Sequence, residues 1–455
     1  MKAAFYTLGC KVNQYDTEVF KDILAREGFG IVDFKDNADI YIINTCIVTH
    51  VAERKSRQYI RKAKRMNPDS YVAVVGCYPQ VFPEKADELE EVDFYLGTTD
   101  RLKILDLVKR LKDSLAIDSK TNTDKAIISR AVSVSPVLPY KDEERFEDLE
   151  LDYCQGRKGF KSRHFLKVQE GCERFCSYCI VPYARGKVKS RPLISIIKEA
   201  KKALESGFKE IILTGSNLGA YGDESFYKPD LVDLIRALTS INEEFRIRLS
   251  SIEPMEIDKR LIEEIKRNNK ICPHLHIPLQ SGDDKVLQDM NRPYNRREFK
   301  KLMEMILRSV PDISLTTDII VGFPGEDEEN FLRTKNFLKD IGFADLHVFR
   351  YSKREKTPAA EFSDQVDENI KEQRSLELIN LAGELNVNYQ KSFLGRKLRA
   401  LVETEQDGYY TALTGNYLKV LIISQDFNKN NVNKGEIVKV KPYLFDKKLI
   451  CKIIK

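Results

Sequence analysis

The sequence has 455 residues, of which 42% are hydrophobic and 32% charged, with nine cysteines and a formal net charge of +5. A chain of this length exceeds one hydrophobic core and predicts two or three domains. No apolar run reaches the roughly 20 residues that span a bilayer, and the N-terminus lacks a signal-peptide pattern, so we expect a cytoplasmic protein. In that reducing compartment, an odd number of cysteines favours metal binding or catalysis over disulfides.

Residues 1–112 predict an α/β domain with a doubly wound parallel sheet. Three short apolar runs indicate buried strands, and they alternate with segments of helical periodicity. Each of these strands leads into a cysteine, namely Cys10, Cys46 and Cys77. Ligands of parallel sheets bind beyond the carboxyl ends of the strands, so the three thiols can converge on one point. Ordinary buried core cysteines are the alternative.

The second helical segment, residues 51–67, is strongly basic. Such a run usually marks a solvated face, and contact with RNA is the other interpretation. Its basic residues are Arg54, Lys55, Arg57, Arg61, Lys62, Lys64 and Arg65.

Residues 113–160 are polar and charged, and indicate a linker or hairpin. Residues 161–388 then contain six strand candidates separated by amphipathic helices, which predicts a partial (β/α)6 barrel. The active site of such a barrel lies at the carboxyl ends of its strands. Polar side chains follow or end several of these strands: Asn217, Glu253, Gln280 and Asp318.

Residues 391–455 predict a small antiparallel β-barrel made of short strands and turns. From Lys391 to the end the chain has 13 Lys and Arg against six Asp and Glu. A small basic module of this kind favours a polyanionic partner.

The stretch EGCERFCSYCIVPYARG contains Cys172, Cys176 and Cys179 within eight residues. Three thiolates from one loop can hold a [4Fe–4S] cluster and leave one iron open. Zinc is the main rival, but structural zinc sites have four ligands, and no fourth cysteine or histidine lies in this stretch.

This C-x-x-x-C-x-x-C motif after the first strand of a partial barrel resembles the signature of the radical S-adenosylmethionine superfamily. The resemblance implies that the open iron binds the methionine part of S-adenosylmethionine, from which a 5′-deoxyadenosyl radical is generated. It also implies that Tyr178, before the last cysteine, lies near the adenine. A loop aromatic packed on the barrel rim is the alternative for Tyr178.

The whole chain is similar to a narrower family, the methylthiotransferases. Seven sequence motifs carry this similarity: TLGCKVNQYDTE, NTCIVT, VGCYPQ, CERFCSYCIVPYARG, LTGSNLGAYG, LQSGDDKVLQDMNRPY and DIIVGFPGE. The resemblance implies a C-terminal TRAM-like barrel and a second [4Fe–4S] cluster on Cys10, Cys46 and Cys77. It implies no catalytic residues beyond the cluster ligands. Cys154, Cys272 and Cys451 have no such setting and are interpreted as structural.

The same resemblance places the loop with Asn217 and Gly219 beside S-adenosylmethionine, and we expect further contacts from Glu253, Gln280 and Asp318. An N-cap role for Asn217 and ordinary strand-end polar groups are the alternatives. His274 and His276 could form a metal pair, although core histidines are favoured. Arg185 and Arg191 could bind a phosphate or a cofactor carboxylate, and exposure to solvent at the surface is the alternative.

The motif around Cys10, LGCKVN, resembles the motif of one branch of this family. That branch methylthiolates carbon 2 of N6-threonylcarbamoyladenosine beside the tRNA anticodon. This implies two S-adenosylmethionine molecules per turnover, tRNA as partner, and an electron donor such as flavodoxin or ferredoxin. Isopentenyladenosine in tRNA or a ribosomal-protein aspartate are alternative substrates. A non-enzymatic zinc-containing RNA-binding protein is the distant alternative.

Overall fold

A computed structural model describes residues 1–121, 131–137, 162–223, 229–425, 432–445 and 448–454, without the side chains of 113–121. The chain divides into two compact units. The first comprises Met1–Gln155, Glu170–Phe175 and Cys179–Lys189, and the second comprises Gly156–Gln169, Cys176–Tyr178 and Ser190–Lys455. Within the described residues, no helix combines the length and apolar character needed to span a bilayer.

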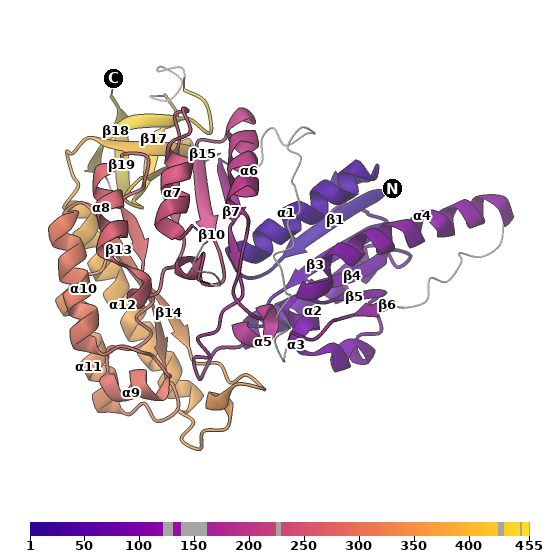
Figure 1. Ribbon diagram of the computed structural model, residues 1–455, viewed down its shortest axis with the longest axis horizontal. Helices are drawn as coiled ribbons and strands as arrows, with labels where there is room; N and C mark the ends of the chain where they lie inside the picture. Colours follow the sequence, from indigo (N-terminus) through magenta and orange to yellow (C-terminus); the bar gives the residue numbers. More distant parts are fainter. Residues whose placement is uncertain (122–130, 138–161, 224–228, 426–431, 446–447, 455) are drawn as a thin grey trace. The chain divides into compact units, whose positions relative to one another are not determined.

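The first unit contains a six-stranded sheet whose paired neighbours all run parallel, in the order β2-β1-β3-β4-β5-β6 (Figure 1). The strands are β1 (Lys2–Thr7), β2 (Gly30–Val32), β3 (Ile40–Thr45), β4 (Tyr71–Gly76), β5 (Phe94–Leu96) and β6 (Ala131–Ser133). The helices are α1 (Lys11–Arg26), α2 (His50–Met66), α3 (Cys77–Val81), α4 (Ile104–Thr121) and α5 (Val181–Arg185), with 3-10 turns η1 (Pro83–Glu88) and η2 (Thr98–Lys103).

Helices cover both faces of this sheet, because alternate strand residues point to opposite sides. On one face Ile40 and Ile42 of β3 share a core with α1 and α4. On the other face Tyr41 and Ile43 share a core with α2, α3 and α5. The predicted doubly wound parallel sheet is therefore confirmed.

The segment 113–160 differs from the predicted linker where the structure describes it. Helix α4 continues to Thr121, and β6 adds a sixth strand by pairing with β5. Three residues are too short a run for an alternating pattern to stand out, so the sequence did not indicate this strand. Residues 138–160 of the predicted linker lie outside the described residues.

The second unit contains six strands in two three-stranded parallel sheets, β11-β10-β7 and β12-β13-β14. Parallel bridges between Ile247 and Ile271 and between Ser251 and His276 connect the sheets into one curved half-barrel. The strands are β7 (Arg163–Lys167), β10 (Glu210–Thr214), β11 (Arg246–Leu249), β12 (His274–His276), β13 (Ser314–Val321) and β14 (Asp345–Arg350). These are the six strands that the sequence predicts.

Helices cover the outer face of the half-barrel (Figure 1), and all of them except α9 contribute to its large apolar core. They are α6 (Leu193–Glu205), α7 (Leu231–Thr239), α8 (Lys259–Arg267), α9 (Asp284–Asp289), α10 (Arg296–Ser309), α11 (Glu328–Ile341) and α12 (Glu368–Lys391), with turns η3 (Leu218–Ala220), η4 (Pro254–Glu256) and η5 (Pro358–Ala360). The short strands β8 (Gln169–Glu170) and β9 (Lys189–Ser190) pair at the two ends of the loop that contains the three clustered cysteines.

The C-terminal strands form a closed barrel in the order β15-β16-β17-β19-β18. They are β15 (Leu398–Gln406), β16 (Tyr409–Thr414), β17 (Lys419–Ile423), β18 (Ile437–Phe445) and β19 (Lys448–Ile453). The pairing is antiparallel as predicted, except between β17 and β19, which run parallel. The small barrel is confirmed, and its similarity to a TRAM domain stays a prediction.

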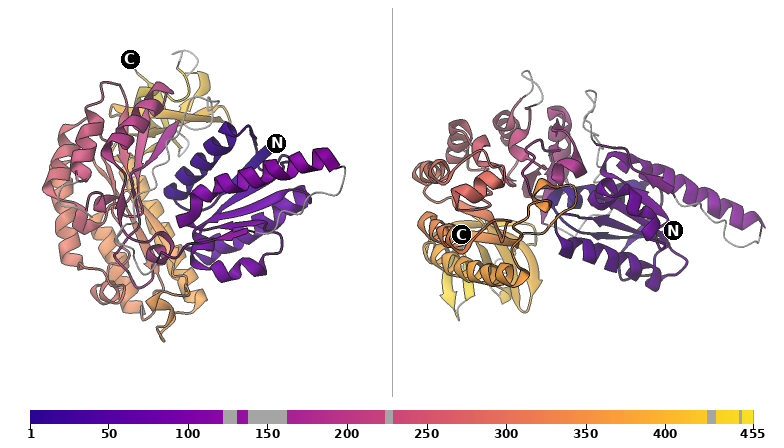
Figure 2. Two further views of the ribbon diagram at one scale, coloured as in Figure 1. Left: turned by 45° about the vertical axis from the view of Figure 1, so that its right-hand side comes forward. Right: turned by 90° about the horizontal axis from the view of Figure 1, so that it is seen from below.

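The small barrel lies beside the half-barrel (Figure 2). Two buried arginines attach it there. Arg246 and Arg248 of β11 both bind Glu210 of β10 and also donate to backbone carbonyls of the small barrel, those of Leu413 and Thr414. These residues lie toward the N-terminal ends of the parallel strands. The carboxyl ends, where barrel active sites lie, are thus left to the loops.

Candidate active site

Three thiols lie just beyond adjacent strands of the first unit. Cys10 follows β1, Cys46 follows β3 and Cys77 follows β4, and these strands are neighbours in the sheet. Gly9 has a φ of +96°, which other residues rarely adopt. A Cβ on Gly9 would lie 2.7 Å from Cβ of Cys46. The glycine therefore allows the loop after β1 to approach the loop after β3.

Asn13, in the first turn of α1, ties these loops together. Its Nδ2 donates to the backbone carbonyls of Leu8 at 2.8 Å and Thr45 at 2.9 Å. Its Oδ1 lies 4.0 Å from Sγ of Cys10 and 3.9 Å from Sγ of Cys77. Asn13 is fully buried, so one side chain fixes the strand ends and faces two of the thiols.

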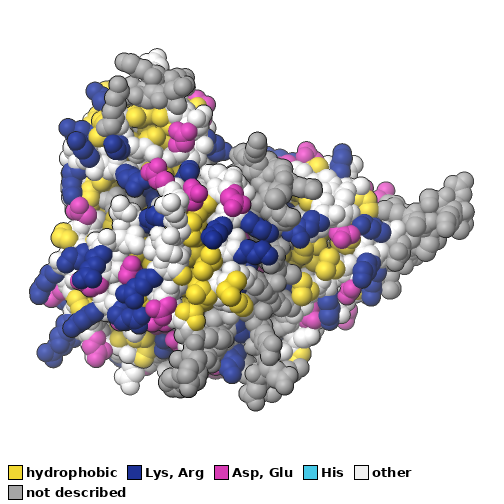
Figure 3. Space-filling model, turned by 45° about the horizontal axis from the view of Figure 1, so that its top comes forward, with side chains coloured by type: hydrophobic (Ala, Val, Ile, Leu, Met, Phe, Trp, Pro, Cys, Tyr) yellow, Lys and Arg dark blue, Asp and Glu magenta, His cyan; other side chains and the backbone are white. Residues whose placement is uncertain are grey.

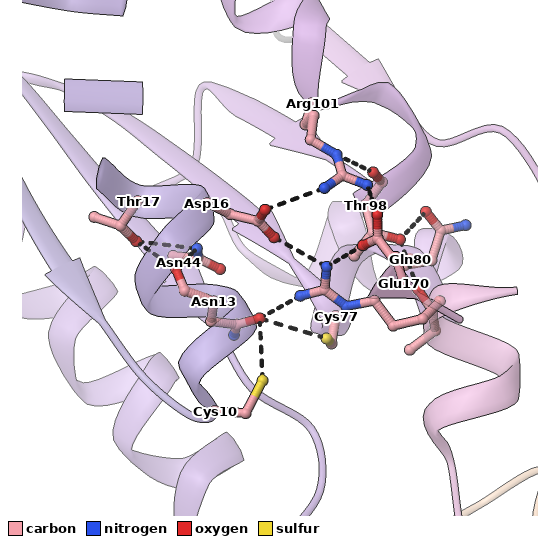
Figure 4. A network of polar contacts seen from close by, with 12 residues as sticks. Cys10, Asn13, Asp16, Thr17, Asn44, Cys77, Gln80, Thr98, Arg101 and Glu170 are labelled. Carbon is pink, nitrogen blue, oxygen red and sulfur yellow. Dashed lines mark hydrogen bonds and ion pairs between the residues drawn. The ribbon is translucent and has the colours of Figure 1, made fainter. Parts of the chain in front are cut away.

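A buried guanidinium lies against the same oxygen (Figure 4). Arg185, the last residue of α5, donates to Oδ1 of Asn13, to Asp16 at 2.9 Å and to Glu170. Arg101 binds the same two carboxylates. Two arginines and two carboxylates therefore form a closed ring of alternating charge, and each side chain is less than a tenth exposed. Each buried charge is compensated, which buried ions require.

Burial changes the acidity of two of the thiols. Burial, followed by the repulsion of Cys77, raises the pKa of Cys46 to about 12. Burial also raises the pKa of Cys77, and the Arg185 guanidinium partly offsets this increase. Thiolates are the form that binds metal, so ligation here requires a bound cationic centre, and Arg185 reduces the repulsion among several thiolates.

Among the residues that the structure describes, His276, Asp318 and His347 form a group of three ligands whose atoms all lie within 4.8 Å of one another.

Hydrogen bonds to the backbone fix the loop with the three clustered cysteines at Cys172 and at Ser177. In the first unit, the backbone N–H of Cys172 donates to the carbonyl of Gly186 at 3.0 Å. In the second unit, Ser177 donates from its N–H to the carbonyl of Met290 and from its hydroxyl to the carbonyl of Asp289. Cys172 and Cys179 belong to the first unit and Cys176 to the second.

Within the second unit, a buried arginine contacts one of these thiols. Arg292 donates from Nη1 to Sγ of Cys176 at 3.2 Å, and its other nitrogen, Nη2, is paired with Glu253. Arg292 also lies over the ring of Tyr294, 5.0 Å from its centroid. The predicted cofactor residue Glu253 is thus placed next to the cysteine loop through one guanidinium.

The loop after β10 places Asn217 in a buried position with an unused acceptor. Its backbone N–H donates to Gln169 at 2.8 Å and its Nδ2 to Oε1 of Glu256 at 2.7 Å. Its Oδ1 is buried and has no hydrogen-bond partner among the described residues. Asn217 stands at the N-cap position of η3, as the alternative expects, but its side chain makes no capping hydrogen bond. An orphaned buried acceptor fits a ligand with N–H groups.

The same loop requires a glycine at position 219, because the side chain of Glu256 approaches its backbone closely. A Cβ at this position would lie 2.1 Å from Oε2 and 2.6 Å from Cβ of Glu256. Glu256 in turn holds Asn217. The glycine therefore acts on the predicted cofactor site through the position of Glu256.

Two other predicted cofactor residues lie near the strand ends. Gln280 has a φ of +68° and pairs with β13, through its N–H to Asp318 and its carbonyl to Ile320. A strained non-glycine residue at a strand end is typical of functional sites. Tyr178 packs against a small apolar cluster that includes Met290 and Phe323.

The structure places Asp318 in a group that the sequence did not reveal. Its Oδ1 lies 3.0 Å from Nε2 of His276 and 3.2 Å from Nδ1 of His347. His276 and His274 are both buried and share a hydrogen bond with the hydroxyl of Thr316. His347 comes from β14, which is 71 positions along the chain from His276, so local spacing carried no signal for it.

Arg185 and Arg191 have partners that the sequence analysis missed. The sequence predicts a phosphate, a cofactor carboxylate or solvent as the partner of each. Both are instead buried, Arg185 in the charged ring and Arg191 against Glu199, which also binds His164. Burial alone would raise the pKa of the Glu199 carboxyl, but the charge of Arg191 and the hydrogen bond of His164 outweigh it and lower this pKa to about 2. Cys272 and Cys451 are buried as predicted for structural cysteines; Cys154 lies outside the described residues.

The basic helix α2 exposes much of its charge. Arg54, Lys55 and Arg65 are exposed, whereas Arg57 pairs with Glu53. Figure 3 shows basic side chains over much of the visible face, mixed with acidic ones. On the face shown, charge alone therefore does not mark one binding surface.

Two segments of the chain match known protein families. Residues 166–338 match the radical SAM superfamily, and residues 2–97 match an uncharacterized protein family, UPF0004. A solved structure of the radical S-adenosylmethionine methyltransferase TsrM from Kitasatospora setae, with cobalamin and a [4Fe-4S] cluster bound, has a TM-score of 0.56 and 14% identity, covering 79% of this chain and 77% of that chain. This likeness shows a shared fold.

Curated relatives extend over nearly the whole chain. The threonylcarbamoyladenosine tRNA methylthiotransferase MtaB of Bacillus subtilis is 40% identical, covering 96% of this chain and 93% of its own. The protein of that name from Aquifex aeolicus is 39% identical, covering 92% and 96%. A tRNA-2-methylthio-N(6)-dimethylallyladenosine synthase of Clostridium tetani is 34% identical, covering 97% and 94%.

Proposed function

The chain belongs to the radical S-adenosylmethionine tRNA methylthiotransferases, and from this premise we propose that it methylthiolates N6-threonylcarbamoyladenosine at carbon 2 of the adenine in tRNA. The observation that carries this proposal is the second thiol group around Asn13, which exists in addition to the C-x-x-x-C-x-x-C loop. Generating a radical needs one cluster; a second cysteine site suits a separate task, the supply of sulfur. The relatives with 40% and 39% identity support the threonylcarbamoyl substrate.

The six cysteines divide into two ligand sets. Cys172, Cys176 and Cys179 would hold the [4Fe–4S] cluster that binds S-adenosylmethionine, and Cys10, Cys46 and Cys77 would hold a second one. Both sets offer three thiols and leave one iron open, which is the condition for binding a further ligand. When bound, the first cluster and S-adenosylmethionine supply the radical that removes hydrogen from the adenine.

The protein's own residues hold and orient these groups. Arg185 keeps a positive charge beside the N-terminal thiols, and Arg292 donates to Sγ of Cys176. Asn217 offers its buried Oδ1 to the amino group of S-adenosylmethionine, and the remaining contacts would come from Tyr178, Gly219, Glu253 and Gln280. Asp318, predicted for the same role, is engaged with two histidines.

For tRNA we propose contacts from α2 and from the small C-terminal barrel. Exposed Arg54 and Lys55 on α2 suit phosphates, and the C-terminal segment carries excess positive charge. Phosphate contacts make affinity depend on salt. Replacing both residues with Gln should therefore weaken tRNA binding and reduce its salt dependence.

The proposal is tested by mass spectrometry of tRNA nucleosides from the host lacking this gene. We expect loss of the methylthio-threonylcarbamoyl nucleoside and accumulation of its unmethylthiolated precursor. The parent gene should restore the product, and Cys46→Ala or Cys176→Ala should not. Anaerobically purified protein should hold about eight irons, and each variant about four.

A dimethylallyl substrate is the second candidate, because synthases acting on dimethylallyladenosine are 34% identical. Loss of that methylthio nucleoside in the deletion strain would keep the chemistry and replace the substrate. If no tRNA nucleoside changed, the tRNA proposal would be wrong.

A further inference from the structure

The half-barrel contains a polar group that the proposed chemistry does not use. His276 of β12, Asp318 of β13 and His347 of β14 lie on three adjacent strands. Their ligand atoms all lie within 4.8 Å of one another. The neighbours Leu275, Ile319 and Leu346 belong to the apolar core under the helices. Since successive strand residues alternate in direction, the three polar residues face the inside of the half-barrel.

Hydrogen bonds fix the direction of His347. Oδ1 of Asp318 accepts from both imidazoles, and Thr316 fixes His276 through Nδ1 at 2.9 Å. The rings of His276 and His347 stack with 5.0 Å between centroids. The carboxylate therefore turns Nδ1 of His347 toward itself and Nε2, on the other side of the ring, away from it.

His347 is the accessible member of the group. Its side chain is 46% exposed, whereas His276 is 9% and Asp318 25% exposed. Arg246 and Arg248, the basic residues on β11, are bound to Glu210 and to the C-terminal barrel. His347 thus presents an imidazole supported by a carboxylate on the inner side of the half-barrel.

An exposed aromatic ring lies two residues farther along β14. Phe349 is 44% exposed and faces the same side as His347, about 7 Å away along the strand. A purine can stack on such a ring, as unstacked bases do in RNA recognition. The distance matches the reach from an adenine ring to the carboxylate at the end of an N6-threonylcarbamoyl group. The dimethylallyl group has no charge at this position.

We propose that His347, oriented by Asp318, binds the carboxylate of the threonylcarbamoyl group and so selects this substrate over an apolar one. The inference rests on the proposed function and adds the residue that recognises the substituent. His347 acts by charge-assisted hydrogen bonding to a group several bonds away from the reacting carbon. Asp318 is a positioning residue that holds the imidazole.

The test uses anticodon stem-loop RNAs carrying either N6-threonylcarbamoyladenosine or the same nucleoside with its carboxylate converted to a methylamide. We expect the reconstituted parent to have at least a tenfold lower KM for the carboxylate RNA. His347→Gln should raise that KM about tenfold, with little change for the methylamide RNA. Asp318→Asn should reduce the preference in the same direction. Arg308→Gln, at an exposed pair with Glu304 on the outer helix α10, is the control and should retain it.

The outcomes separate this inference from the proposed function. If the parent methylthiolates both RNAs with equal KM, the carboxylate-binding role is wrong although the function stands. If it methylthiolates neither but accepts the dimethylallyl RNA, the substrate itself is wrong. If purified parent retains one equivalent of zinc that His347→Gln loses, with RNA preference unchanged, the group is a metal site and the inference is overturned.

Discussion

Arg185 donates a hydrogen bond to Oδ1 of Asn13, the atom that lies about as close to Sγ of Cys10 as to Sγ of Cys77. The two residues are 172 positions apart in the sequence. The contact places a permanent positive charge beside thiols that become negative when they bind metal. It also makes the residue that ends the cysteine loop a part of the N-terminal thiol site.

Replacing Arg185 with Met should destabilise the protein by about 3 kcal/mol, because Asp16 and Glu170 each lose one partner in a buried ring. Arg185→Lys should recover part of this loss, since an ammonium keeps the charge but lacks the fork that reaches several acceptors. The free energy of unfolding in urea measures both. Arg61→Met, at an exposed pair with Glu91, should cost less than about 1 kcal/mol. Equal losses at Arg185 and Arg61 would contradict the structural role of the ring.

The raised pKa of Cys46 predicts a stability loss at alkaline pH in protein without metal. The folded-state pKa is about 12 and the reference value is 9.0. The folded state therefore holds the proton more tightly, and this stabilisation is present below pH 9 and is lost as pH rises toward 12. By pH 10.5 the titration of this thiol should have lowered the free energy of unfolding by about 2 kcal/mol relative to its value well below pH 9. Urea unfolding between pH 8 and 10.5 should show a shallower decline for Cys46→Ala than for the parent; parallel curves would refute the prediction.

Local patterns predicted the elements of the fold, and long-range contacts determined the details of the site. Apolar runs such as those of β3 and β13 are buried on both faces, so their composition alone marked them as strands. The three cysteines followed strand ends, which made their meeting predictable. Asn13 lies three residues after Cys10, so its place near that thiol could be expected from the sequence. No residue near Arg185 in the sequence indicated that its partners are Asn13, Asp16 and Glu170.

The histidine group shows the same limit. The HLH word marked His274 and His276, yet no further ligand was visible nearby in the sequence. The pairing of β13 with β14 brings Asp318 opposite His347, and strand register of this kind is set by the whole sheet. The short β6 was missed because three residues inside a polar segment carry no periodic pattern.

The contact between Arg292 and Cys176 predicts an effect on redox potential. Hydrogen bonds to cluster sulfurs stabilise the reduced, more negative state and raise the potential. Arg292→Gln removes the positive charge beside Cys176, so the midpoint potential of the cluster in this loop should fall. Potentiometric titration followed by electron paramagnetic resonance measures it. Arg296→Gln, at a partly exposed pair with Asp284, is the control and should leave it unchanged. An unaltered potential in Arg292→Gln at full iron content would disprove the prediction.

Gly219 offers a test of the loop proposed to bind S-adenosylmethionine. In Gly219→Ala the new Cβ would collide with Glu256, including its Cβ at 2.6 Å, so Glu256 must move. Its bond to Nδ2 of Asn217 is then lost or displaced, and the buried Oδ1 no longer points to one place. We expect at least tenfold weaker binding of S-adenosylmethionine, measured by calorimetry on reconstituted protein.

Gly383→Ala is the matched control for this substitution. Gly383 lies within α12, and a Cβ there meets nothing within 4 Å. Alanine should therefore stabilise the helix by about 0.5–1 kcal/mol and leave the affinity for S-adenosylmethionine unchanged. If Gly219→Ala bound S-adenosylmethionine as tightly as Gly383→Ala, the loop after β10 would have no part in that site, and Asn217 would have to be assigned a purely structural role.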